Sequence, residues 1–460
     1  MNGFASASLP RILRNASFTV CMILLAPAIP LHAASREKSV ASTPAIPAAL
    51  RNAIDRTLGS GQWAETQEVT EADPAFDPEF GVSVALHGTT AMVGAQQARI
   101  GGNEAQGAVY VFEESGGTWT RTQKLVASDG QAFDTFGNAI VFSGTTALIG
   151  AYGVMVNDNF SQGAVYVFTL SDGTWTQTQK ITADDGQAFN NFGYSLGLTG
   201  TTALICADGA TVGSNDFQGK VYAFTEADGT WTQGQTLVAS DGGIGDIFGY
   251  SIAFDGTTAV IGAYANNGYQ GAAYVFGTTD GTWAETQKLV ADDGAPNAYF
   301  GYATALSGST VLVGSWGASP GGNDMQGAAY LFTESDGIWS QTQELVADDG
   351  AAGDKFGHSV ALQGTTALIG ADGWSNSSAQ GAVYAFDASD GVFVQSQKFV
   401  ASDGAPSYQF GLPVTLDGDT ALVGSWLWMS PDDLMPGAAY FFTRGPGDTI
   451  FADGFDGATP

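Results

Sequence analysis

The sequence predicts an all-β protein, a seven-bladed β-propeller built from four-stranded antiparallel blades. A unit of 52 to 56 residues occurs seven times, and every copy carries the dipeptide Phe-Gly, at Phe80, Phe136, Phe192, Phe248, Phe300, Phe356 and Phe410. Each copy holds four short runs of β-branched and aromatic residues bounded by Gly or Asp, with no helical periodicity between them. Four-stranded units repeated in this number close radially, which protects the edges of the sheets.

The four strands expected in each unit are called A to D in chain order. In the second unit strand A begins at Phe136, strand B is "TALIGA", strand C is "AVYVF" and strand D is "TWTQTQKI". Antiparallel order places the B–C and D–A loops on one face of the ring and the A–B and C–D turns on the other. We call these the loop face and the turn face.

The phase of the repeat predicts how the ring closes. A D strand, "WAETQEV" at Trp63, precedes the first A strand, and the last unit stops after a C strand ending at Phe442. We therefore expect the N-terminal strand to join the last blade and complete it. An open array would instead carry capping repeats.

Several residues that occur once per unit have structural interpretations. We expect aromatic residues at the start of the D strands to pack between neighbouring sheets, at Trp63, Trp119, Trp175, Trp231, Trp283, Trp339 and Phe393. The Gln of the D strands is expected to bond the neighbouring backbone, and the Gly of Phe-Gly to permit close backbone approach. Cys206 replaces a Gly of the sister copies and is expected to be a small buried residue rather than a reactive thiol.

The ends of the sequence lie outside the repeats. Residues 1–34 have the features of a signal peptide, with Arg11 and Arg14 before an apolar run and small residues for cleavage near Ala34. We expect a linker over 35–61, the ring over 62–443 and a C-terminal tail over 444–460. The predicted protein is a secreted, periplasmic or cell-surface monomeric ring that is not inserted in a membrane.

The charge restricts the class of partner. The net charge is −31, and residues 62–460 contain nine of the 15 Lys and Arg but 44 of the 46 Asp and Glu. Such a surface repels nucleic acid and anionic lipid, and no nucleic-acid partner is expected. Cations, basic proteins and neutral glycans remain compatible with it.

The repeat resembles a known one. The pattern "FG-x-S-[VI]", an apolar strand ending in "VGA" or "IGA", and then "G-A-x-Y-x-F" is similar to the FG-GAP repeat of integrin α-subunits, and closer still to exported bacterial FG-GAP proteins. The resemblance covers residues 62–443 and implies a seven-bladed ring with a recognition or adhesion role. It also implies an aromatic cage at the axis that receives a basic side chain by cation–π contact. Tyr194, Tyr250 and Tyr302, which follow Phe-Gly in three consecutive units, form part of such a cage.

The loop face is where the copies differ, so we expect the ligand there. Four tryptophans lie outside the D strands, all in the B–C loops of units five to seven: Trp316, Trp374, Trp426 and Trp428. With Tyr299 and Tyr302 they are the expected contacts to a protein or glycan ligand. The alternative, in which these aromatic residues pack long loops together, is equally compatible with the sequence.

Calcium is the one cofactor that the sequence suggests. In integrins the ion lies in A–B loops of the form D-x-D-x-D-G, which the Gly-Thr turns here do not match. Asp pairs in the D–A loops are the remaining candidates: Asp129 with Asp134, Asp241 with Asp246, and Asp349 with Asp354. These pairs could instead cap tight loops as Asx turns.

Catalysis has little support in the sequence. Outside the leader the chain has only His87 and His358, on different units, and no pair of carboxylates stands out. We therefore expect a non-catalytic recognition or adhesion module. Two alternatives remain, a secreted hydrolase using loop carboxylates and a structural component of the cell surface.

Overall fold

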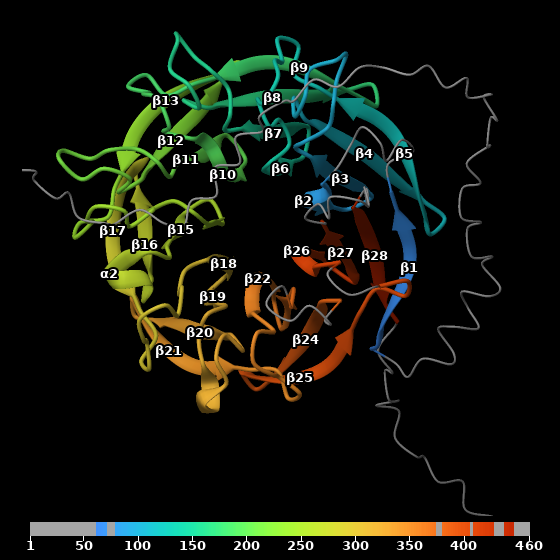
Figure 1. Cartoon of the computed structure of the whole chain (residues 1–460), viewed down its shortest axis with the longest axis vertical. Helices are drawn as coiled ribbons and strands as arrows, with labels where there is room; N and C mark the ends of the chain where they lie inside the picture. Colours follow the sequence, from blue (N-terminus) through green and yellow to red (C-terminus); the bar gives the residue numbers. More distant parts are fainter. Residues whose placement is uncertain (1–60, 71–78, 374–379, 405–407, 427–436, 446–460) are drawn as a thin grey trace, which may run out of the picture. The chain divides into compact units, whose positions relative to one another are not determined.

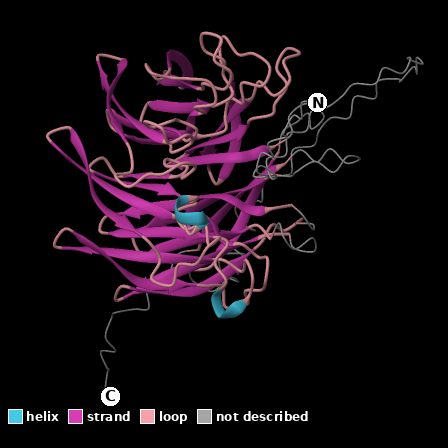
Figure 2. Cartoon of the chain, turned by 60° about the vertical axis from the view of Figure 1, so that its left-hand side comes forward, coloured by secondary structure: helices cyan, strands magenta, loops and turns pink. Residues whose placement is uncertain are grey.

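The computed structural model describes residues 61–70, 79–373, 380–404, 408–426 and 437–445, which form a ring of seven four-stranded antiparallel sheets (Figure 1). The prediction of a seven-bladed propeller is confirmed. Almost all of the described chain is strand or loop, and only two short helical turns occur in it, α2 (Asn266–Tyr269) and η1 (Pro320–Gly322), both in B–C loops (Figure 2). No helix among the described residues is long and apolar enough to cross a membrane.

Each blade contributes one strand to each of four concentric layers. The innermost A strands are β2 (Phe80–His87), β6 (Ile140–Ser143), β10 (Phe192–Thr199), β14 (Ile252–Phe254), β18 (Ala303–Ser307), β22 (Phe356–Gln363) and β26 (Phe410–Asp417). The B strands are β3 (Thr90–Ala95), β7 (Thr146–Ala151), β11 (Thr202–Ala207), β15 (Thr258–Ala263), β19 (Thr310–Ser315), β23 (Thr366–Ala371) and β27 (Thr420–Ser425). The sequence predicts that every A strand starts at Phe-Gly. In blades 2, 4 and 5 the strand instead begins three or four residues later, at Ile140, Ile252 and Ala303.

The two outer layers are more regular. The C strands are β4 (Ala108–Ser115), β8 (Ala164–Ser171), β12 (Lys220–Ala227), β16 (Ala272–Thr279), β20 (Ala328–Ser335), β24 (Ala382–Ser389) and β28 (Ala438–Arg444). The D strands are β5 (Thr118–Leu125), β9 (Thr174–Ile181), β13 (Thr230–Leu237), β17 (Thr282–Leu289), β21 (Ile338–Leu345), β25 (Val392–Phe399) and β1 (Trp63–Val69). In the C–D turn of blade 2, Asp172 and Gly173 both have positive φ, 50° and 73°. This is the conformation of a two-residue hairpin turn that matches the twist of the strands, and it explains the repeated Asp-Gly.

The ring closes as the sequence predicts. The seventh sheet has the order β1-β28-β27-β26, so the N-terminal strand is the outer strand of the last blade. Trp63 pairs with Arg444 and Val69 with Ala439 in an antiparallel register. No blade is therefore left without its outer strand.

A double hydrogen bond from the D-strand Gln joins each blade to the next. In Gln179 the side-chain Nε2 donates to the carbonyl of Trp231 at 2.9 Å, and Oε1 accepts from its N–H at 2.8 Å. We call this pair of hydrogen bonds the clasp. It recurs at Gln67, Gln123, Gln235, Gln287, Gln343 and Gln397. Gln397 clasps Trp63, so the closure uses the same bonds as every other interface between blades.

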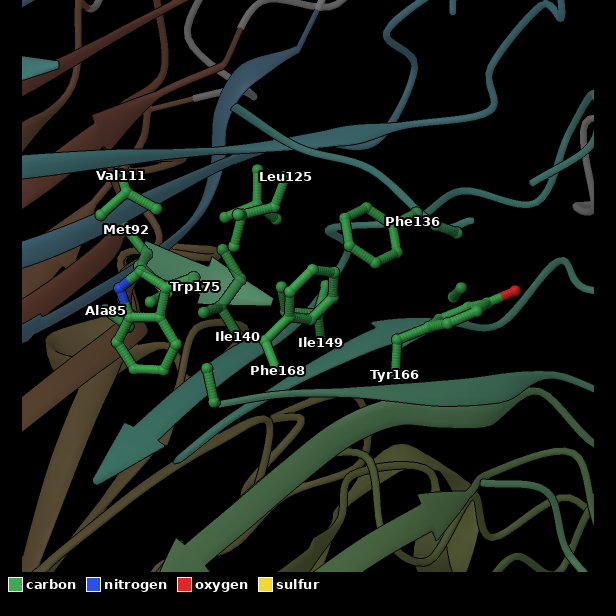
Figure 3. Close-up of a cluster of buried hydrophobic side chains, with 14 of the residues drawn as sticks. Ala85, Met92, Val111, Leu125, Phe136, Ile140, Ile149, Tyr166, Phe168 and Trp175 are labelled. Carbon is green, nitrogen blue, oxygen red and sulfur yellow. The ribbon is translucent and has the colours of Figure 1, made fainter. Parts of the chain in front are cut away.

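The hydrophobic core is divided among the interfaces between blades. Figure 3 shows one such cluster, in which Trp175 of blade 2 lies near Ala85 and Met92 of blade 1. The seven aromatic residues near the start of the D strands are all buried, with at most 8% of the residue exposed. Their predicted role in packing between neighbouring sheets is confirmed.

The Phe-Gly dipeptide seats each blade against the one before it. Phe192 is fully buried, and a Cβ on Gly193 (φ +92°) would lie 2.7 Å from the carbonyl oxygen of Ala164. Only glycine fits this close approach, as the sequence predicts. Cys206 is also fully buried, and burial raises the pKa of its thiol well above the usual value, consistent with its predicted role as a small core residue.

Candidate functional site

Three positions of each blade lie together around the axis on the loop face. The first precedes Phe-Gly: Glu79, Thr135, Asn191, Ile247, Tyr299, Lys355 and Gln409. The second follows Phe-Gly: Val82, Asn138, Tyr194, Tyr250, Tyr302, His358 and Leu412. The third follows strand B: Gln96, Tyr152, Asp208, Tyr264, Trp316, Asp372 and Trp426.

The position before Phe-Gly has an unusual backbone conformation. All seven residues there have left-handed φ values, between 53° and 65°, although none of them is glycine. In Thr135 and Ile247 this is a steric outlier, because both side chains are β-branched. The conformation brings this residue onto the residue after strand B of the same blade, as in the hydrogen bond from Asn191 to Asp208 and the stack of Tyr299 on Trp316.

Nine rings form a continuous aromatic belt across blades 2 to 6. Its members are Tyr152, Tyr194, Tyr250, Tyr264, Tyr269, Tyr299, Tyr302, Trp316 and His358. Tyr299 and Trp316 stack with centroids 4.1 Å apart, and the hydroxyl groups of Tyr250 and Tyr302 are 2.7 Å apart. Burial raises the pKa of Tyr250 and Tyr302 well above the usual value, so both hydroxyls stay protonated at neutral pH.

Two buried carboxylates lie at one end of the belt. Asp208 is 7% exposed and accepts a hydrogen bond from Asn191 Nδ2 at 2.9 Å, and its burial raises the pKa of the carboxyl to about 6. Glu79, also 7% exposed, accepts from Gln96 and Gln97, and burial raises its pKa as well. Both charges act on Tyr152, which lies between them in the repeat and whose pKa is raised mainly by burial. In the described part of the chain no Lys, Arg or His forms an ion pair with either carboxylate.

The other end of the belt carries a histidine and a lysine. His358 Nδ1 lies 3.1 Å from Asp372 Oδ2, and both side chains are buried. The Lys355 ammonium lies 4.8 Å from the centre of the Trp316 ring, and burial lowers the pKa of this lysine. Among the described residues, therefore, the axis has one end with two carboxylates that lack a cationic partner and another end where a lysine lies on an aromatic face.

The structure places most of the predicted ligand contacts in this belt. Tyr194, Tyr250 and Tyr302 contact one another in sequence, and Tyr299 and Trp316 stack beside them. Trp426 occupies the same position in blade 7 as Trp316 does in blade 5 and is half-buried. Trp374 and Trp428 lie outside the described residues. Trp316 Nε1 is buried without a hydrogen-bond partner among the described residues.

The two aspartates of each D–A loop pair have different hydrogen-bond partners. The first Asp of each pair accepts from a tyrosine and a lysine; Asp129 binds the Tyr166 hydroxyl at 2.9 Å and the Lys180 ammonium at 2.6 Å, and this pairing lowers the pKa of Asp129. Asp241 and Asp349 make the same two contacts. The second Asp accepts from a backbone N–H three residues earlier, at Asp134, Asp246 and Asp354.

This geometry bears on calcium. Each first carboxylate already has an ammonium partner, and each second one caps its loop. Among the described residues no group of three or more His, Cys, Asp or Glu is arranged to hold a metal ion. Calcium at these pairs stays a prediction that would require the lysine contacts to be exchanged for the ion.

Comparison with protein families agrees with the ring and its repeat. The model of the FG-GAP repeat matches seven segments, one per blade: 63–112, 119–168, 175–224, 231–276, 283–332, 339–386 and 393–442. The chain belongs to the FG-GAP repeat family. FG-GAP repeats are typical of extracellular proteins. A search of curated proteins finds no match.

Within this FG-GAP ring, sequence reasoning missed part of the belt. It singled out Trp316 and Trp426 as loop tryptophans but passed over Tyr152 and Tyr264, which occupy the same position after strand B. It also missed Asp208, at that position in blade 3. Aligning the seven copies at this one position would have found all five side chains, because the position has no residue common to most of the copies.

Proposed function

We propose that this FG-GAP ring is a non-catalytic recognition or adhesion module that binds a protein ligand on its loop face, with a cationic group of the ligand seated at the axis. The observation that carries the proposal is the aromatic belt with Asp208 and Glu79 at one end. Ring faces attract cations, and a buried carboxylate without a counter-ion gains most from one. A neutral glycan stacking on the same rings is the other ligand compatible with the belt.

The predicted anchors Trp316, Trp374, Trp426 and Trp428 belong to this proposal, with Tyr299 and Tyr302. Trp316 supports it most directly, since its ring lies between Tyr299 and His358 and its indole N–H lacks a partner among the described residues. A ligand acceptor would satisfy that N–H. Lys355 already occupies one side of the Trp316 ring, which leaves the end of the belt near Asp208 and Tyr152 for the cation.

The test begins with a glycan array and a peptide library screened against the purified protein. Affinity for the best binder is then measured with Trp316→Ala and Trp426→Ala, and with Trp231→Ala as a control for packing. Truncating a true anchor should weaken binding by about 2 kcal/mol or more. Trp231→Ala should instead cost about 3–5 kcal/mol of folding stability with little change in affinity. If the loop-face variants melt lower but bind unchanged, these aromatic residues only pack the loops.

A hydrolase is the second candidate, and one observation favours it. Asp208, with a pKa of about 6, can hold or release a proton near neutral pH, as a general acid requires. Turnover on a panel of glycans and esters that is lost in Asp208→Asn, while the variant stays folded, would overturn the non-catalytic proposal.

A further inference from the structure

Exposed apolar side chains occur on the loop face, in the loops within and between blades 1 to 4. They are Phe133, Met155, Phe160, Phe189, Phe217, Ile244 and Tyr269, each between 47% and 72% exposed. All seven belong to D–A or B–C loops; Figure 1 shows blades 2 and 3 adjacent in the upper part of the ring. The remaining exposed large apolar side chains of the described chain are aliphatic and lie on or just after D strands of blades 4 to 6. Clustered exposed apolar groups on a soluble protein mark contact surfaces.

Comparison of the blades shows that folding does not require these side chains. In blade 1 the B–C loop carries Arg99 and Glu104, which form an ion pair at 2.9 Å. In blade 3 the same two positions are Thr211 and Asp216, joined by a hydrogen bond at 3.2 Å. Blade 2 has Met155 and Phe160 there, both about half exposed. The loop keeps the same conformation with a polar pair, so the apolar pair serves something other than the fold.

Backbone conformation gives a second, independent observation. Phe133 and Phe189 lie three residues before the Phe of Phe-Gly and have left-handed φ values of 67° and 63°. The same position in blades 4 to 6 is Gly245, Asn297 and Gly353, residue types that adopt this region readily. A phenylalanine there carries a steric cost, and its side chain is exposed. Phe189 also contacts Phe160, with ring centroids 5.6 Å apart and a hydrogen bond from its N–H to the Phe160 carbonyl.

The charges around this surface decide what can cover it. Asp158, Asp184 and Asp216 are exposed on the same loops. The nearby lysines Lys180 and Lys220 are each held by an aspartate at 2.6 Å and so add no free positive charge. An acidic rim repels anionic lipid and a second copy of this chain, which has a net charge of −31. It attracts Lys and Arg.

We propose that Phe133, Met155, Phe160, Phe189 and Phe217 form a docking surface for an extended segment of a protein partner that presents apolar side chains beside Lys or Arg. This inference rests on the proposed function and names the partner's chemistry. The loop that carries Met155 begins at Tyr152 of the aromatic belt, three residues away, so one segment can reach both. The basic residue of the partner's segment lies at the axis near Asp208, and the apolar residues of the segment lie farther out, on Phe160 and Phe189.

The experiment is selection of random peptides on the purified protein. Peptides of about 12 residues are used, which extend over about 40 Å at ~3.4 Å per residue. We expect enrichment of aromatic or leucine residues together with Lys or Arg. A synthetic copy of the best peptide is then titrated against Phe160→Ser/Phe189→Ser and against Ile338→Ser/Val394→Ser, a matched pair of exposed apolar residues on D strands. The first pair should weaken binding at least tenfold and the second should not, with unchanged melting in both.

Other outcomes overturn the inference. It is wrong if no peptides are enriched, if acidic peptides are, or if both double variants bind alike. The inference is also wrong if the wild-type protein binds phosphatidylcholine vesicles, or self-associates in sedimentation, and the Phe160→Ser/Phe189→Ser change abolishes that behaviour while peptide binding is unchanged. Trp316→Ala separates this inference from the proposed function. If only Trp316→Ala loses binding, the axial site is supported and the docking surface is contradicted. If only the Phe160→Ser/Phe189→Ser variant loses binding, the docking surface is supported and the axial site is contradicted.

Discussion

The clasp that closes the ring gives the sharpest test of the fold. Gln397 Oε1 accepts from the Trp63 N–H at 2.7 Å, and its Nε2 donates to the Trp63 carbonyl at 2.8 Å. Gln397→Ala removes both bonds and leaves two backbone groups of a partly buried strand without a partner. Each net hydrogen bond contributes about 1 kcal/mol, and an unsatisfied group adds to the loss, so we expect the free energy of unfolding to fall by about 1–3 kcal/mol.

The matched control is Gln179→Ala, which breaks the same two bonds between blades 2 and 3. Blades 2 and 3 remain joined through the chain and their packed core. β1 differs in one respect, because no chain segment connects it directly to blade 6. Its pairing with β28 holds it to blade 7, and side-chain bonds of Gln397 and Glu65 join it to blade 6 and to the loop that follows. Gln397→Ala should therefore allow β1 to open locally, whereas Gln179→Ala should not.

Urea unfolding and amide hydrogen exchange measure the two effects. Both variants should show similar losses of global stability, and only Gln397→Ala should speed exchange in residues 63–69. Exchange of these residues at the wild-type rate in Gln397→Ala would refute the role assigned to the closing clasp. A loss of less than about 0.5 kcal/mol in both variants would refute the hydrogen-bond argument itself.

Two further predictions concern closure and pH. Deleting residues 62–70 should lower the melting temperature far more than deleting 446–460 and should promote aggregation, because it exposes the β28 edge; equal melting of the two truncations would contradict closure by β1. Burial raises the pKa of Asp208 to about 6, so the folded state binds this proton more tightly than the unfolded chain and the contribution of Asp208 to stability is lost as pH rises from about 4 to 6. Asp208→Asn keeps an acceptor for Asn191 and should stabilise the protein by up to ~2–3 kcal/mol at about pH 8 but not at about pH 4. Urea titrations at the two pH values measure this difference. A stability difference that does not depend on pH would show that the carboxyl is not buried in its charged form.

The sequence predicted the fold well because the fold depends on what the copies share. Phe-Gly, the D-strand aromatic residue and its Gln each make one contact per blade interface, and selection for that contact preserves them seven times. The phase of the repeat likewise predicted the pairing of β1 with β28. The shortened A strands of blades 2, 4 and 5 were not predictable, since the residues that follow Phe-Gly there remain compatible with extended structure.

The site was harder to predict because its residues are distant in the sequence, and a particular backbone conformation is needed to bring them into contact. Asn191 and Asp208 are 17 positions apart, and their contact depends on the left-handed conformation of the residue before Phe-Gly. Nothing in the local sequence of Thr135 or Ile247 suggests that conformation, because β-branched residues disfavour it. The exposed phenylalanines were missed for a related reason, since in a chain with 28 Phe an apolar residue in a loop gives no sign of its exposure.

Some positions of the repeat are the same in every blade and form the fold, whereas the positions around the axis vary. This division explains how a repeated backbone can carry a specific site. The interface between blades determines the conformation before Phe-Gly, since residues as different as Glu79, Ile247 and Lys355 all adopt it. The fold therefore sets the direction of that side chain whatever its chemistry, and the residue is free to vary from blade to blade. Seven blades with three such positions each give an axial surface whose charge and aromatic content can change without loss of the ring. In this chain the variation has produced carboxylates on blades 1, 3 and 6 and an aromatic belt across blades 2 to 6. Asp372 of blade 6 faces His358, whereas Glu79 and Asp208 have no ion-pair partner among the described residues, which is the asymmetry that a cationic ligand would recognise.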